Sequence, residues 1–241
     1  GKAENDYTKY LVKDGLNGKK VGLLKKSMGF SDKVDSLMNE VVRFLKSNGA
    51  EVVVVDLDSS DYEDASMEVM LFEFKDGLNK YLAGLDNPPV RNLAELIGYN
   101  KKDSVELRYF DQKIFEMAEK KGDLNSREYK KALDKMLNAS RKNGIDKLMN
   151  EKKLDAIMAP TGSPAWKTDL ILGDHFVGGS SSPAAIAGYP AITVPMGFIE
   201  NLPVGVTFFG KAWTEGKLIS IAYSYEQGTK NRRTPKYMVT D

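Results

Sequence analysis

The stretch from Lys19 to Leu57, KKVGLLKKSMGFSDKVDSLMNEVVRFLKSNGAEVVVVDL, decides the fold class. Its opening, KKVGLLKK, predicts a short strand, and its β-branched end, AEVVVVDL, predicts a buried strand. Between them Ser31 stands at an expected helix N-cap, and apolar residues follow at three- and four-residue spacing up to Asn48-Gly49. A strand, a helix and a strand within about 40 residues predict a βαβ unit with parallel strands.

Downstream of this unit the pattern first becomes helical and then returns to strands. Residues 61–153 carry apolar stripes at helical spacing, with breaks expected at 84–89, 98 and 122–126. After them we expect strands at 154–160, 190–198 and 203–211, a small-residue helix at 183–189 begun by Ser182 and Pro183, and a last helix at 215–231. The predicted fold class is α/β, a mixed β-sheet covered by helices. We expect one domain over 1–241 with a helical insertion at about 61–153.

Composition excludes several classes of function. The chain of 241 residues has 35 basic and 34 acidic residues, a formal net charge of +1, which argues against a nucleic-acid or membrane partner. It has no cysteine, which excludes disulfides, thiolate zinc sites and a cysteine nucleophile. That absence suits a reducing or an oxidising compartment, so cytoplasmic and periplasmic locations both stay open.

The serine-rich stretch GGSSSPAAIAGYPAITVPMGF, at 178–198, is the first candidate for chemistry. Ser180 to Ser182 follow the lone His175 and its neighbour Asp174, and these are the residue types of a catalytic triad. However, His175 and Ser180 lie on one short loop, and the chain has no GxSxG nucleophile elbow. Asp169, Asp174 and His175 do not show a recognised zinc spacing, and GGSSS lacks the phosphate-binding glycine patterns. These residues therefore predict neither a zinc site nor a nucleotide site.

Several further motifs carry a family resemblance. LDAIMAPTGSPAW, DHFVGGSSSPAAIAGYPAITVPMGF, LPVGVTFFGKAW and AYSYEQGTK, in this order, resemble the amidase signature family, and most closely its bacterial members related to peptide amidase. The resemblance extends upstream to DYTKYLVKDGLNGKKVGLL and covers essentially the whole chain. It implies the C-terminal half of an amidase-signature fold, and it implies no metal or organic cofactor.

The family's catalytic residues lie elsewhere in its pattern. Members use a serine nucleophile, a second serine in a cis peptide bond and a lysine base, with the serines in segments of the GGSSGGS and TGGS types. Neither segment occurs in this sequence, and GGSSSPAAIAG is followed directly by YPAITVPMGF, which marks the family's C-terminal half. The resemblance thus implies no catalytic residue in this chain, inactivity of the chain alone, and a missing N-terminal catalytic half as its partner.

The resemblance also implies a role in substrate binding. The intact enzyme would hydrolyse a small amide or a peptide amide, and this chain would supply one wall of the cleft. Loops that flank strands commonly carry such walls. The candidate binding residues lie in two loops: Thr161, Gly162 and Trp166 in one, and Asp174, His175, Gly179, Ser180, Ser181 and Ser182 in the other.

Two other functions stay open at this point. The chain could be a non-catalytic interaction module derived from an amidase, or a hydrolase that uses His175 with one of Ser180 to Ser182. If half of a shared sheet is absent, exposed strand edges and apolar surface also predict self-association of the chain, unless its helices cover that surface.

Overall fold

The chain forms two compact units in the computed structural model, which describes residues 2–57, 60–108 and 110–236. One unit combines Gly1–Asp58 with Ser140–Asp241, and the other is Ser59–Ala139. The first carries the sheet and the second is helical. The helical segment expected at about 61–153 therefore divides, because residues 140–153 fold with the sheet.

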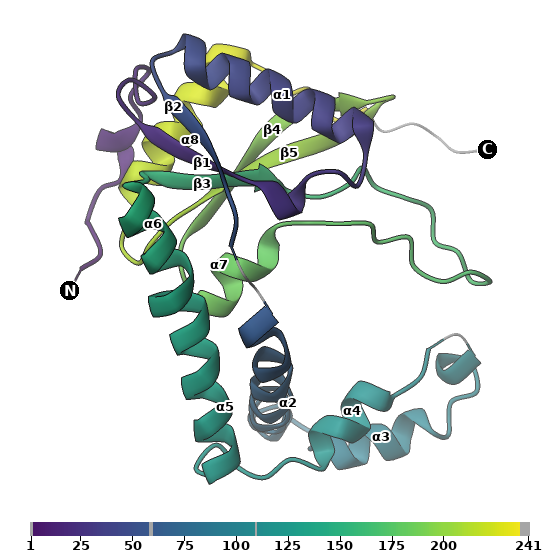
Figure 1. The fold of residues 1–241 in the computed structure, drawn as a ribbon. Helices are drawn as coiled ribbons and strands as arrows, with labels where there is room; N and C mark the ends of the chain where they lie inside the picture. Colours follow the sequence, from purple (N-terminus) through teal and green to yellow (C-terminus); the bar gives the residue numbers. More distant parts are fainter. Residues whose placement is uncertain (1, 58–59, 109, 237–241) are drawn as a thin grey trace. The chain divides into compact units, whose positions relative to one another are not determined.

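A five-stranded mixed sheet organises the first unit, in the order β2-β1-β3-β5-β4 (Figure 1). Its parallel part consists of β1 and its two neighbours, and β5 runs antiparallel to both β3 and β4. The predicted mixed sheet and the parallel βαβ unit are both confirmed. The strands are β1 (Lys20–Leu24), β2 (Glu51–Val55), β3 (Ala156–Pro160), β4 (Ala191–Ile199) and β5 (Leu202–Phe209).

The strand β2 corrects one expectation. Its β-branched run predicts a buried strand, yet β2 stands at one end of the strand order and only Val55 in it is buried. The strand β3 is the one buried throughout. β-Branched residues favour the extended backbone on edge and central strands alike, so composition does not reveal a strand's neighbours.

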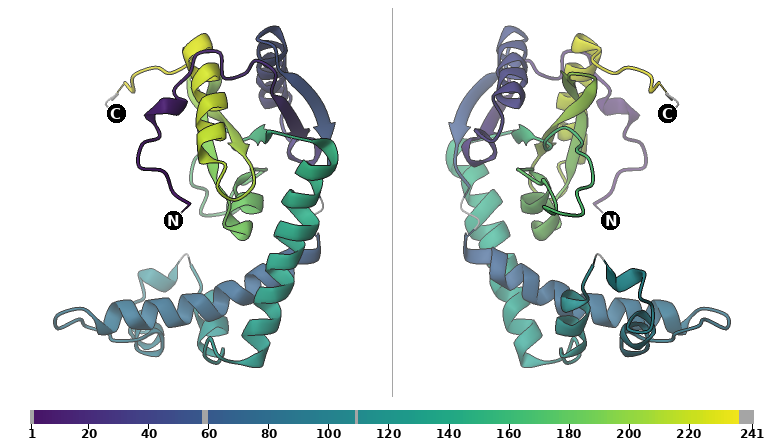
Figure 2. Two further views of the ribbon diagram at one scale, coloured as in Figure 1. Left: turned by 90° about the vertical axis from the view of Figure 1, so that its left-hand side faces the viewer. Right: turned by 90° about the vertical axis from the view of Figure 1, so that its right-hand side faces the viewer.

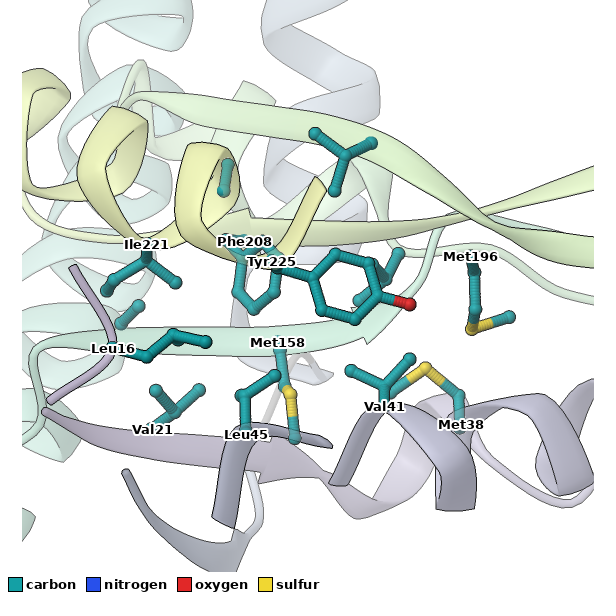
Figure 3. Packing of buried hydrophobic residues seen from close by; sticks show 14 of the residues in the cluster. Leu16, Val21, Met38, Val41, Leu45, Met158, Met196, Phe208, Ile221 and Tyr225 are labelled. Carbon is teal, nitrogen blue, oxygen red and sulfur yellow. The ribbon is translucent and has the colours of Figure 1, made fainter. Parts of the chain in front are cut away.

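The helices α1 (Asp32–Ser47) and α8 (Glu215–Thr229) pack on one face of the sheet (Figure 1). The predicted cap of α1 is confirmed, because the Ser31 hydroxyl accepts a hydrogen bond from the Val34 amide at 3.5 Å. Figure 3 shows Met38, Val41 and Leu45 of α1 facing the side chains of the sheet and α8 across this core. The α8 helix lies along the β4–β5 hairpin, as Figure 2 shows.

The opposite face of the sheet is covered by shorter helices. Ile145 and Met149, at the start and within α6 (Asp146–Lys152), pack with Ala184 and Ala187 of α7 (Ser181–Ala187) in a second core cluster. A π-helical segment, Asn138–Ile145, precedes α6. Short 3-10 turns lie at Thr8–Tyr10 and Lys25–Ser27.

The helical unit has its own small core. Leu71, Leu93, Ile97 and Ala118 are buried there, with Phe74 and Phe115 packed against them. The break expected at residue 98 is wrong, because this residue lies inside a helix, Leu93–Asn100. No helix in the described ranges is both long and apolar enough to cross a membrane. The elements are α2 (Ser60–Ala83), α3 (Leu93–Asn100), a 3-10 turn (Glu106–Arg108), α4 (Lys113–Glu119) and α5 (Arg127–Leu137).

Candidate substrate-binding wall

The candidate wall begins at the carboxyl end of β3, where the parallel strands of an α/β sheet commonly present a site. Thr161 follows the strand, and its amide donates to the Gly205 carbonyl at 2.8 Å. Its hydroxyl lies 2.8 Å from the Thr207 hydroxyl, which in turn lies 2.8 Å from the hydroxyl of Thr193. A chain of three hydroxyls, from Thr161 just after β3 to Thr207 in β5 and Thr193 in β4, therefore holds the Thr161 side chain.

The two predicted loops are the two ends of one long loop. An antiparallel bridge joins Gly162 to Gly179, and the Ser180 amide donates to the Thr161 carbonyl at 3.3 Å. We call residues 163–178, which lie between the bridged glycines, the strap. The bridge brings Thr161 and Gly162 beside Gly179 and Ser180, so four candidate residues from the two loops meet at the root of the strap.

Each of the other candidates in the strap contacts a side chain of the same strap. The Trp166 indole N–H donates to Asp174 Oδ1 at 2.7 Å, and His175 Nε2 lies 3.2 Å from Asp169 Oδ2. The Trp166 ring also meets the Phe176 ring edge-on, at 6.4 Å between centroids. Asp174 is therefore engaged with the indole, and the imidazole has a different carboxylate as its partner.

Sequence reasoning missed Asp169 as the organising residue of the strap. Its Oδ1 accepts from the amides of Ile171 and Leu172, both at 2.8 Å, in addition to the Oδ2 contact with His175. The Leu172 and Ile171 amides, followed by His175, hold the pKa of the Asp169 carboxyl below its usual value. An aspartate that precedes a short turn closed by Gly173 was the available signal, because such side chains commonly accept from amides two residues on.

The serines do not assemble a nucleophile with a base. Ser180 is only 2% exposed, and its hydroxyl has no hydrogen-bond partner in the part of the chain that the structure describes. Ser181 and Ser182 are exposed at the start of α7. The prediction that Ser182 caps this helix is wrong. The N-cap is Ser180, whose side chain makes no capping bond. The backbone amide of Ser180 donates to the Thr161 carbonyl.

An open hollow of about 550 Å³ lies along the strap. It is bordered by charged and apolar side chains, namely Lys167, Thr168, Asp169, Leu170, Ile171 and His175. Within residues 2–57, 60–108 and 110–236, no group of three His, Asp or Glu side chains is placed to hold a metal ion.

Comparison with known proteins identifies the family of this chain. The amidase family model matches residues 2–219. The chain belongs to the amidase family. The resemblance seen in the motifs is thereby confirmed, and the activity at the level of the family is hydrolysis of amide C–N bonds.

Individual amidases and their relatives match nearly the whole chain. A probable amidase of Arabidopsis thaliana is 36% identical over 98% of this chain and 43% of its own length. The native peptide amidase of Stenotrophomonas maltophilia, a solved structure, is 38% identical with a TM-score of 0.86, over 99% of this chain and 48% of its own. One of the subunits of the glutamyl-tRNA(Gln) amidotransferase of Clostridium botulinum is 30% identical over 91% of this chain and 47% of its own.

The chain therefore spans about half the length of the relatives it matches. It corresponds to their C-terminal portion, and its mixed sheet with helices is that of the amidase-signature fold. The expected fold class is confirmed in both respects.

Proposed function

We propose that this chain is the C-terminal part of a serine-dependent amidase, that it supplies one wall of the substrate cleft, and that it is inactive alone. The observation that carries the proposal is the state of its serine loop. Ser180 is buried, and the lone imidazole is engaged with Asp169. A serine nucleophile needs an adjacent base, so this loop suits binding rather than attack.

The proposed division of roles follows from the geometry of the strap. Four residues meet at the root of the strap and form the part of the wall next to the sheet: Thr161, Gly162, Gly179 and Ser180. Trp166, Asp174 and His175 extend the wall along the strap, and Ser181 and Ser182 are exposed beside it at the start of α7. The serine nucleophile, the second serine and the lysine base come from the N-terminal half, which is the proposed partner.

A small amide or a peptide amide is the proposed substrate. The similarity to the peptide amidase of Stenotrophomonas maltophilia supports this class. In the assembled enzyme the serine attacks the carboxamide carbon, and the C–N bond breaks as ammonia or an amine leaves with a proton. Water then hydrolyses the acyl-enzyme to the acid. The residues of the wall hold and orient the substrate during both steps, which need no metal or organic cofactor.

The test is ammonia release from C-terminally amidated peptides by the purified chain, beside labelling with a fluorophosphonate that reacts with activated serines. We expect neither turnover nor label. Turnover with a label on one of Ser180 to Ser182, lost in the His175→Ala variant, would overturn the proposal and show that this loop is an active site. Turnover that survives His175→Ala would also overturn the predicted inactivity, while excluding the imidazole as the base.

A further inference from the structure

The tip of the strap presents apolar side chains to solvent. Ile171 is 92% exposed, Leu172 is 80% exposed, and Phe176 is 65% exposed. Trp166, Leu170 and Val177 of the same strap are also exposed. Single apolar residues on a surface are ordinary, but a cluster of large ones on one short segment is typical of an interaction site.

Hydrogen bonds close the turn at this tip. The Asp169 carboxylate accepts from the Ile171 and Leu172 amides, and the Gly173 amide donates to the Asp169 carbonyl at 3.2 Å. Gly173 has a φ of +89°, which glycine adopts without strain. The tip therefore presents two large apolar side chains on a hydrogen-bonded turn, and pre-organisation of this kind lowers the entropic cost of binding.

Two buried hydroxyls at the root of the strap and directly beside it lack hydrogen-bond partners among the described residues. The hydroxyls of Ser163 and Ser180 are buried and, among the described residues, neither has a hydrogen-bond partner. Buried polar groups are nearly always paired in complete structures, and an unpaired one is destabilising. The buried hydroxyls near the root therefore need hydrogen-bonding groups, and the exposed side chains of the tip need an apolar surface.

We propose that the strap is a docking element for the N-terminal half of the amidase, with the Ile171 and Leu172 side chains inserted into an apolar pocket of that half. This inference rests on the proposed function, which makes that half the partner. The share of the relatives that this chain leaves uncovered argues for this occupant, because the similar peptide amidase is matched over only 48% of its length. The strap also belongs to the substrate wall, so docking at its tip would fix the wall relative to the catalytic serine.

Co-expression tests the docking. The full chain is produced with the part of the Stenotrophomonas maltophilia peptide amidase that it does not cover, and the complex is followed by light scattering and by ammonia release. The strap variant is Ile171→Asp, which places a charge in the proposed apolar contact. The matched control is Val105→Asp, at an apolar residue of the helical unit that is also largely exposed. Melting temperatures of the chain alone confirm that both variants fold.

We expect Ile171→Asp to weaken the complex at least about 30-fold, as loss of a central apolar anchor does, while the control stays within about twofold. A wild-type complex that Ile171→Asp leaves intact, or that both variants weaken equally, would overturn the docking role and leave the proposed function standing. No complex with the wild-type chain would overturn the docking role, while turnover and labelling of the chain alone decide the proposed function separately. Self-association of the chain that Ile171→Asp abolishes, beside an unchanged mixed complex, would show that the tip binds a second copy instead.

Discussion

The core under α1 and α8 and the tip of the strap use the same kinds of residue in opposite surroundings. Ile221 and Phe208 are fully buried in the core, whereas Ile171 and Phe176 are 92% and 65% exposed on the strap. In the core this chain supplies both layers, the sheet and the helices that cover it. No second layer of that kind covers the strap in the described part of this chain, so its apolar side chains are exposed to solvent. Side-chain type creates the tendency to be buried, and only a partnering surface satisfies it.

The largest expected difference in the free energy of unfolding is between alanine substitutions at Phe208 in the core and Phe176 on the strap. Phe208→Ala should lower the free energy of unfolding of the sheet-bearing unit by about 3–5 kcal/mol, because it leaves a cavity beside the Tyr225 ring, 6.2 Å away between centroids. Phe176→Ala on the strap should change it by less than about 1 kcal/mol. Urea unfolding measures both. Equal losses would show that the strap is part of the folded core.

A second effect comes from a buried tyrosine of the core. Burial raises the pKa of Tyr225 to about 12, although Asn231 and Thr229 near it act in the opposite direction. The unfolded chain ionises near its ordinary value of about 10, so the stabilisation is complete below that pH and is lost as the pH rises through about 12. The loss amounts to about 3 kcal/mol between these limits. Tyr225→Phe should reduce the slope of unfolding free energy against pH in this range, and an unchanged slope would contradict the assignment to Tyr225.

Smaller effects on stability are expected at two serines that stand at the starts of helices. The Ser31 hydroxyl caps α1, so Ser31→Ala should cost about 1 kcal/mol of stability. The Ser180 hydroxyl at the start of α7 caps nothing and is buried without a partner among the described residues. Ser180→Ala should therefore be neutral, or stabilise the chain alone by up to about 1 kcal/mol. Thermal melts of both variants test this pair, and a large loss in Ser180→Ala would reveal a partner within the chain.

The smallest effect on global stability is expected at the tip itself. Asp169→Ala removes the acceptor of the Ile171 and Leu172 amides, so these amides should exchange with solvent much faster. The melting temperature should hardly change, because the tip buries little surface. Hydrogen exchange read residue by residue measures the first effect. Unchanged protection of both amides would show that the carboxylate does not order the tip.

Much of the fold could be predicted because it depends on local patterns. The cap at Ser31, the helical spacing after it and the β-branched run that follows are local signals, and each gave the correct element. The place of β2 at the sheet edge could not be predicted, because edge position depends on which strands pair. The start of α7 was also misplaced, since a contact of Ser180 with Thr161, distant in sequence, sets the backbone there.

The sequence by itself determined the α/β class, the family resemblance and the two loops from which the candidate site is built. It could do so because residue types and short-range spacing encode strands, helices and motifs. Only the tertiary structure decided that Gly162 pairs with Gly179 and that His175 faces Asp169 instead of a serine. The path of the chain beyond β3 sets both contacts. Two residues near each other in sequence have side-chain directions that spacing does not fix, and the Asp169 turn supplies the carboxylate that the imidazole contacts.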